Sequence, residues 1–318
     1  MQDKLIKRAK ELLAEGKVQK VVGWKKGLFD DDITPAVFTT AEELDKDFVF
    51  NKYCKANLSK YLVKITREIE VAKSTTRMNN TMAKQRDPNA EDKPIPQATA
   101  LVFLKPSDTY SFTQLLKENR ITRGDVYAIG VPCQDTLDGG EVCENCKNKK
   151  PVSCDELIGI EADITPVEST RMAEVAKLEA MTPDQRDAFW KNEFSRCLRC
   201  NACRDICPAC TCEKCVFDNN ALYTSQKVAE TSFEESLFHI VRAWHVAGRC
   251  TDCGECSRVC PQNIPLHLLN RKFIKDINEI YGPYQAGSDL ETRPPMLTFK
   301  EEDPEATIIS DREEGGNE

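Results

Sequence analysis

Two runs of cysteines in the C-terminal half of the chain share one spacing. Both read CxxCxxCxxxCP, the first from Cys197 to Pro208 and the second from Cys250 to Pro261. A 4Fe-4S cube has four irons that each need a thiolate, and CxxCxxC can supply three of them. The fourth cysteine is turned away by the proline and reaches the other cluster. The spacing therefore predicts two 4Fe-4S clusters with crossed ligands: Cys197, Cys200, Cys203 and Cys260 for the first, and Cys207, Cys250, Cys253 and Cys256 for the second.

The composition fits metal ligation better than disulfide bonding. The chain has 318 residues and 16 cysteines, eleven of which lie between positions 197 and 260. Disulfide frameworks belong to small secreted domains, whereas this chain is large and begins without an apolar leader. Zinc is the alternative metal, but zinc sites rarely use eight cysteines at this spacing. We therefore expect reduced thiolates that ligate iron.

Charge and hydropathy narrow the class of protein further. The formal net charge is −8, which argues against nucleic acid as the main partner. No stretch approaches the roughly 20 apolar residues that a membrane helix needs, so no membrane span is predicted. These features favour a soluble, cytoplasmic protein.

The remaining cysteines form two further groups. Cys210, Cys212 and Cys215 directly follow the first run; they are either ligands of a further metal site or reduced side chains packed beside the first cluster. In the N-terminal half, Cys133 follows a predicted strand, at the end where α/β sheets place their sites. With Cys143 and Cys146 it predicts a third 4Fe-4S cluster, and zinc or a redox disulfide are the alternatives. The spacing leaves Cys54 and Cys154 open as the fourth ligand.

The N-terminal half predicts an α/β domain with a mostly parallel sheet. Helical spacing over residues 3–15, 54–65 and 110–117 alternates with strand-like runs at 18–24, 98–104 and 125–131. The later strand, helix and strand fit a βαβ unit. The polar stretch 73–97 contains three prolines and no periodicity, which predicts a long loop.

The C-terminal half predicts an α-helical dicluster ferredoxin, so the fold class is α+β with several domains. Thr182 and Pro183 are suited to begin a helix that leads to Cys197. Helices are also expected over residues 232–248, where Phe233, Leu237, Ile240, Val241 and Trp244 lie on one stripe, and over 266–280. His239, His245 and His267 are interpreted as packing or surface residues on these helices. The predicted domains are 1–165, 182–281 and an acidic, proline-containing tail at 282–318, expected to be poorly ordered unless a partner binds it.

The chain resembles a known family over most of residues 1–280. The N-terminal half is similar to the β-subunits of deazaflavin-coenzyme-reducing hydrogenases and formate dehydrogenases, through NKYCKANLSKYLV at 51–63, GDVYAIGVPC at 124–133 and CENCKNKKPVSCDELIG at 143–159. The C-terminal half resembles, at 197–218 and 238–269, the dicluster module of the heterodisulfide-reductase small-subunit type that is often fused to it. The resemblance implies one 4Fe-4S cluster in the N-terminal domain, with Cys54 rather than Cys154 as its fourth ligand.

Some members of this family also bind a flavin (FAD) that passes hydride to a deazaflavin. The family tends to have a Gly-Cys-Asp turn after the strand that here lies at 98–104. This chain has Lys105-Pro106-Ser107-Asp108 instead, a departure that argues against flavin and direct hydride chemistry.

Three functions follow as hypotheses. The first is an electron-transfer subunit of an anaerobic oxidoreductase complex, without a substrate site of its own, because the chain shows iron–sulfur ligands but no catalytic triad, Walker loop or GxGxxG. The resemblance implies as its partners a formate dehydrogenase or hydrogenase on one side and a flavoprotein or heterodisulfide-reductase-like subunit on the other. The second is a flavin-containing oxidoreductase of a deazaflavin or nicotinamide coenzyme. The third is a structural module that holds zinc.

Overall fold

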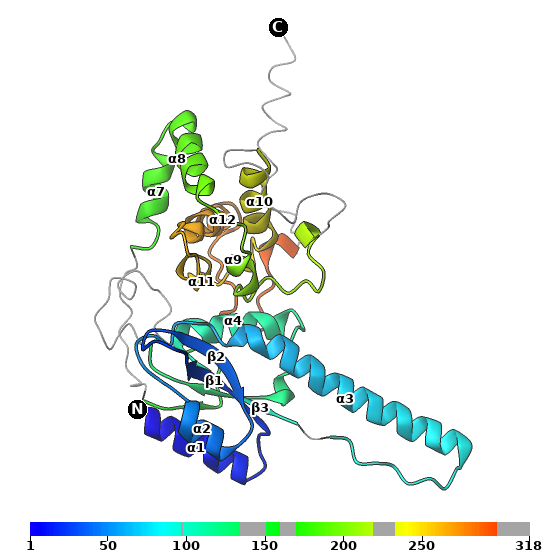
Figure 1. Ribbon diagram of the computed structural model, residues 1–318. Helices are drawn as coiled ribbons and strands as arrows, with labels where there is room; N and C mark the ends of the chain where they lie inside the picture. The colour runs from blue at the N-terminus through cyan, green and yellow to red at the C-terminus, as the bar shows by residue number, and fades with distance from the viewer. Residues whose placement is uncertain (97, 134–150, 160–169, 219–232, 298–318) are drawn as a thin grey trace.

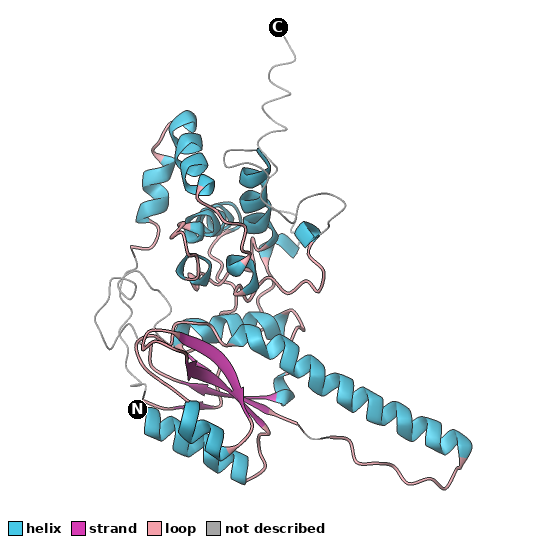
Figure 2. Ribbon diagram, in the orientation of Figure 1, coloured by secondary structure: helices cyan, strands magenta, loops and turns pink. Residues whose placement is uncertain are grey.

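The computed structural model describes residues 1–96, 98–133, 151–159, 170–218 and 233–297. A helix-and-sheet part is built from the N-terminal half, and the helices that follow residue 170 gather on the side of it where α4 lies (Figures 1 and 2). None of the described helices combines the length and the apolar character that a membrane crossing requires.

The sheet is mostly parallel, as predicted. Its strands are β1 (Lys20–Lys26), β2 (Ile33–Phe38), β3 (Ala100–Leu104), β4 (Val126–Gly130) and β5 (Glu156–Leu157), in the order β2-β1-β3-β4-β5. Only the β1–β2 pair is antiparallel. Sequence reasoning missed β2, whose Pro35 suits the edge position that the strand occupies. All five residues of β3 are buried, because parallel strands are covered on both faces.

Within the described residues, four helices accompany the sheet: α1 (Gln2–Ala14), α2 (Ala41–Asp47), α3 (Ser59–Arg86) and α4 (Pro106–Lys117). The expected loop at 73–97 is wrong for its first half, because α3 continues to Arg86. Residues 73–86 lack proline and glycine and include Lys, Arg, Met, Ala and Gln, which favour helix without a buried face. The helix ends before Pro88. Figure 1 shows its far half projecting away from the sheet.

The core of the N-terminal domain lies between the sheet and these helices. Its largest fully buried side chains include Trp24, Phe103, Phe112 and Leu62. Each such side chain stabilises the fold by about 2–3 kcal/mol relative to an exposed one. This core contains no residue of the C-terminal half, so it serves the N-terminal domain alone.

The C-terminal part is helical over its described residues. It contains α7 (Ala173–Glu179), α8 (Pro183–Ser195), α9 (Ala202–Asp205), α10 (Phe233–His245), α11 (Glu255–Arg258) and α12 (Leu266–Tyr281). Short 3-10 helices occur at Val216–Asp218 and Pro295–Leu297, and at Arg123–Asp125 in the first domain. The Thr182 side chain and Gln185 form a capping box at the start of α8, as the sequence signal indicated.

Helix α10 turns its apolar stripe outward. Phe233 is 73% and Trp244 63% exposed, and Leu237 and Ile240 are exposed as well. The opposite face buries Glu235, Phe238, His239, Arg242 and Ala243, so three polar or charged side chains point inward. An inward charged face needs a polar or charged neighbour inside the domain.

The segment after α12 is ordered by contacts up to residue 297, in contrast to the expected loose tail. Lys117 of α4 donates a hydrogen bond to the Thr292 carbonyl (2.6 Å), and the Asp289 carboxylate accepts from the Thr292 amide (2.6 Å). Gly287 lies at φ +72°, and a Cβ there would come within 1.9 Å of the Tyr110 carbonyl oxygen. Glycine therefore permits the close approach to α4. Residues 298–318 of the predicted tail lie outside the described part.

The two domains meet along α4. Asn57 donates to the Ser111 hydroxyl (3.0 Å), which is 2.8 Å from the hydroxyl of Thr251 in the second cysteine run. All three side chains are buried. At the other end of α4, Arg249 forms an ion pair with Glu118. The second run is thus held directly against the N-terminal domain.

Candidate iron–sulfur sites

The two cysteine runs repeat in backbone conformation as well as in sequence. Arg199 and Asp252, at the same position of each run, have φ values of 54° and 60°. Asn201 (φ 61°) and Gly254 (φ 73°) also correspond, and a four-residue helix, α9 or α11, begins after each. Left-handed residues are uncommon outside glycine. Their recurrence at matched positions indicates two loops shaped for the same kind of ligand.

The first predicted quartet surrounds one small pocket. This pocket is lined by Cys197, Cys200, Cys203 and Cys260, together with Phe238, His239 and Leu266. Cys260 comes from the second run, so the structure brings it to the first loop. Cys197, Cys203 and Cys260 also pack with Phe194 and Ile264 in one apolar cluster. The four cysteines assigned from spacing therefore lie around one pocket, with Cys197 buried and Cys200 at the exposed side.

The second predicted quartet is also brought together across the two runs. Cys207 acts electrostatically on Cys250, Cys253 and Cys256. Burial raises the pKa of all three of these thiols. Water therefore stabilises their thiolates less than it would stabilise those of exposed cysteines, and iron is a cation that can stabilise them.

Backbone amides point at several of these sulfurs. The Arg199 amide donates to Cys197 Sγ (3.3 Å). In the second run, the amides of Asp252, Glu255 and Ser257 donate to Cys250, Cys253 and Cys256, and each bond lowers the pKa of its thiol. Hydrogen bonds to ligand sulfurs are one of the factors that set cluster potentials.

Arg242, on the inner face of α10, is a buried charge among the thiols. It is 2% exposed, and none of its guanidinium nitrogens has a hydrogen-bond partner among the described residues. It acts electrostatically on Cys203 of the first quartet and on Cys256 and Cys207 of the second. An isolated buried cation is costly, so this arrangement fits a pair of anionic thiolate-bound clusters. The sequence signal for Arg242 was weak, namely a charged residue opposite an apolar stripe.

His239 lies beside the first quartet. Its ring stacks on Phe194 with centroids 4.3 Å apart, and its donor atoms lie within 4.8 Å of Cys197 Sγ and a Glu235 oxygen. Burial, with help from Arg242 and Arg199, lowers the pKa of His239 to about 3. The ring is therefore a neutral packing group, which agrees with its interpretation from sequence. His267 accepts or donates a 2.8 Å hydrogen bond with Ser257, and His245 is exposed.

The N-terminal cysteines are only partly described. Cys143 and Cys146 lie outside the described residues. Cys154 lies beside the end of β4, because its Sγ would be 3.4 Å from a Cβ at Gly130, and Cys133 follows three residues after that glycine. Cys54 is fully buried in the apolar core, with its Sγ accepting from the Asn51 amide (3.3 Å), and burial raises its pKa to about 11. Cys54 also lies near this edge, because Lys105 at the end of β3 contacts its carbonyl, so the fourth ligand stays a prediction.

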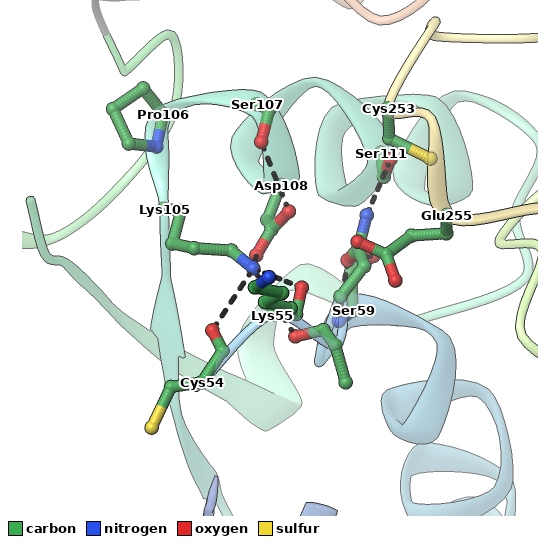
Figure 3. Close-up of polar contacts among 12 residues, drawn as sticks. Cys54, Lys55, Ser59, Lys105, Pro106, Ser107, Asp108, Ser111, Cys253 and Glu255 are labelled. Atoms are coloured by element: carbon green, nitrogen blue, oxygen red, sulfur yellow. Dashed lines mark hydrogen bonds and ion pairs between the residues drawn. The ribbon is translucent and has the colours of Figure 1, made fainter. Parts of the chain in front are cut away.

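The Lys105–Asp108 segment closes the carboxyl end of β3. Lys105 Nζ donates to the carbonyls of Cys54 (3.4 Å), Lys55 and Ala56 (3.5 Å) and lies 3.5 Å from an Asp108 oxygen. Figure 3 shows the Lys105 side chain between its own segment, 105–108, and the segment that begins at Cys54, with the Cys54 thiol directed away from it. The residues that replace the family's Gly-Cys-Asp turn therefore form a buried ion pair that anchors residues 54–56.

The buried carboxyl group of Asp108 should make the free energy of unfolding depend on pH. Burial raises its pKa from 3.8 to about 6, although Lys105 opposes the shift, and Glu255 and Arg258 also face it. The folded state then holds this proton more tightly than the unfolded state, so stability falls as pH rises from about 4 to above 6. Urea unfolding followed by circular dichroism measures the free energy of unfolding. Between pH 5 and pH 8 we expect this free energy to fall by about 1 kcal/mol more in the parent than in Asp108→Asn. The same pH dependence in both proteins would refute the prediction, and Asp31→Asn, at an exposed position, is the control.

Comparison with known proteins agrees with this geometry. Residues 193–264 match the 4Fe-4S dicluster domain family. The chain is 30% identical over 111 residues to the F420-dependent formate dehydrogenase subunit beta of Methanocaldococcus jannaschii (35% of this chain, 28% of the relative). It is 31% identical over 108 residues to F420-dependent formate dehydrogenase 1 subunit beta of Methanococcus maripaludis (34% and 26%). A putative oxidoreductase, YgfK of Escherichia coli K12, is 28% identical over 105 residues (32% and 8%).

The match spans about a quarter of the length of the two formate dehydrogenase subunits. The duplicated loops, the two sets of gathered cysteines and the buried guanidinium between them lie within or beside the matched domain. The chain therefore contains a 4Fe-4S dicluster domain, and over about a third of its length it is similar to the β-subunits of F420-dependent formate dehydrogenases.

Proposed function

We propose that this chain is an electron-transfer subunit of an oxidoreductase complex. Its partners would be a formate dehydrogenase or hydrogenase on one side and a flavoprotein or heterodisulfide-reductase-like subunit on the other. When bound, 4Fe-4S clusters accept and release single electrons. The chain would hold one cluster on Cys197, Cys200, Cys203 and Cys260, and a second on Cys207, Cys250, Cys253 and Cys256.

The proposal is supported by the positions of the cysteines, which follow one another from the second run, past α4, to the edge of the sheet. Cys253 lies near Ser111 of α4 (Figure 3), and the hydroxyl of Thr251, two residues before it, is 2.8 Å from that of Ser111. Helix α4 begins at the carboxyl edge of the sheet, and the Val152 amide there donates to Thr109 (3.1 Å). The N-terminal cysteines Cys133 and Cys154 occupy the same edge. A third cluster on Cys133, Cys143, Cys146 and Cys154 or Cys54 would extend the line of centres into the N-terminal domain.

Two further features support membership in a complex. The related subunits are named as parts of formate dehydrogenases. The outward apolar stripe of α10 is a surface of the kind that marks protein interaction sites. Both features support the presence of a partner protein, whereas the cysteines support electron transfer as the chemistry.

Anaerobic purification with analysis of metal, sulfide, flavin and bound partners tests the function. We expect at least about eight irons with matching acid-labile sulfide per chain. We also expect reduction of the iron–sulfur chromophore when formate or hydrogen is added to the purified complex. Fewer than eight irons, or zinc without sulfide, would end the proposal.

The alternative, a flavin-containing oxidoreductase, would be supported by bound flavin in the same preparation. The Lys105–Asp108 pair at the end of β3 replaces the family's turn and offers no feature specific to a flavin. We therefore expect no flavin absorbance, and stoichiometric flavin would shift the function to this alternative.

A further inference from the structure

A pocket of about 300 Å³ lies where the segment after the first cysteine run meets helix α10 and the N-terminal domain. Three cysteines that neither ferredoxin quartet uses, Cys210, Cys212 and Cys215, line this pocket. His245, at the C-terminal end of α10, lines it as well. Four side chains with donor atoms suited to soft metals therefore face one space.

The segment that carries the three cysteines is held in place through its backbone. Lys60 of α3 donates to the Cys210 carbonyl, and Arg120 donates to that of Thr211. Arg67 forms a 2.5 Å ion pair with Glu213. These contacts all come from the N-terminal domain, so the thiols are presented on an anchored segment rather than on a free loop.

The charges around the pocket favour an anionic occupant. Of the four cations that line it, Arg204 pairs with Asp205 and Asp218, Arg249 pairs with Glu118, and Lys60 bonds the Cys210 carbonyl. Arg242 lines the same pocket and has no hydrogen-bond partner among the described residues. Thiolates bound to a metal centre would place negative charge beside this buried cation.

The distances between the donor atoms of the four side chains help to distinguish a site for a single metal ion from a site for a cluster. A tetrahedral zinc ion with bonds of about 2.3 Å holds its sulfur ligands about 3.8 Å apart. Among the described residues, the group of three donors within 4.8 Å of one another is Cys197, Glu235 and His239, and no three of the four pocket ligands meet that limit. No three cysteines of either ferredoxin quartet meet that limit either, as expected when each thiolate of a cube binds a different iron.

We propose that Cys210, Cys212, Cys215 and His245 hold a further iron–sulfur cluster in this pocket. Imidazole replaces thiolate at some iron–sulfur centres. Cys210 packs against Cys207 of the second quartet, so the additional cluster would adjoin the proposed line of centres. Cys212 and His245 are exposed, which places the additional cluster at the surface, within reach of an external electron carrier.

The test compares iron and sulfide in the anaerobically purified parent chain and in Cys212→Ser/Cys215→Ser. We expect the double variant to lose about four irons and four sulfides. The electron paramagnetic resonance signals of the two ferredoxin clusters should persist. His245→Ala removes a single ligand and should change or abolish the same additional signal. Thr211→Ser, within the same segment, is the control and should keep the full iron content.

Unchanged iron and sulfide in the double variant would overturn this proposal, as would the loss of about one zinc instead of iron. Loss of all iron would also overturn it, because the cysteines would then support the ferredoxin clusters rather than hold their own. The proposed function fails separately, when the parent chain itself contains fewer than eight irons.

Discussion

Cys253→Ala should remove about four irons and one cluster signal from the dicluster domain and stop electron transfer through the chain. The reason is that Cys253 lies in the quartet held against the N-terminal domain, so its loss interrupts the line of centres where the domains meet. The N-terminal domain should remain folded, because its core contains no residue of the C-terminal half. The measurements are iron content, low-temperature electron paramagnetic resonance and the rate at which the partner complex reduces the protein.

The crossed assignment supplies matched controls. Cys207→Ala should remove the same signal as Cys253→Ala, although residue 207 belongs to the first run. Cys260→Ala should instead remove the signal that Cys200→Ala removes. If each variant affected only the signal of its own run, the crossing would be wrong; reduction of Cys253→Ala at the parent rate would exclude the cluster from the electron path.

Arg242→Met should lower the reduction potentials of both ferredoxin clusters. Reduction adds negative charge, and the guanidinium beside Cys203, Cys207 and Cys256 stabilises that charge in a buried setting. Two charges about 6 Å apart at an effective dielectric constant of about 20 interact by about 3 kcal/mol. For a one-electron couple this corresponds to a fall on the order of 100 mV. Redox titration monitored by electron paramagnetic resonance measures both potentials in one sample.

Arg242→Lys is the matched control, because it retains the positive charge with a smaller head group. It should shift the potentials much less than Arg242→Met. Equal shifts in both variants would mean that packing, not charge, is responsible. A shift confined to one cluster would place Arg242 beside that cluster alone.

The sequence predicted the parts of the fold that depend on local pattern and on ligand spacing. The all-apolar run at 100–104 can only be a buried strand between Pro96 and Pro106, and Thr182 with Pro183 specifies a helix start. Both were predictable because they depend on residues that are adjacent in the chain. The structure also puts Cys260 beside the first loop and Cys207 beside the second, while the crossed ligand assignment itself stays a prediction.

The features that the sequence did not predict depend on contacts between residues far apart in the chain, or lack a local pattern. Helix α3 continues past residue 73 without a buried face, so periodicity gave no signal for it. Residues 282–297 are ordered by Lys117 and by the close approach at Gly287, both contacts with distant α4. Hydropathy alone could not show that α10 directs Arg242 and His239 inward, because the reason lies in the thiols beneath them.

The inward charges of α10 also set the order in which the protein can assemble. Synthesised without iron, the C-terminal helices would have to enclose the Arg242 guanidinium without metal-bound thiolates beside it. Metal uptake and packing of these helices should therefore be a single coupled event, as in small domains that stay unfolded until metallated. The N-terminal domain has its own apolar core and can fold first. The metal-bound C-terminal domain would then pack against α4.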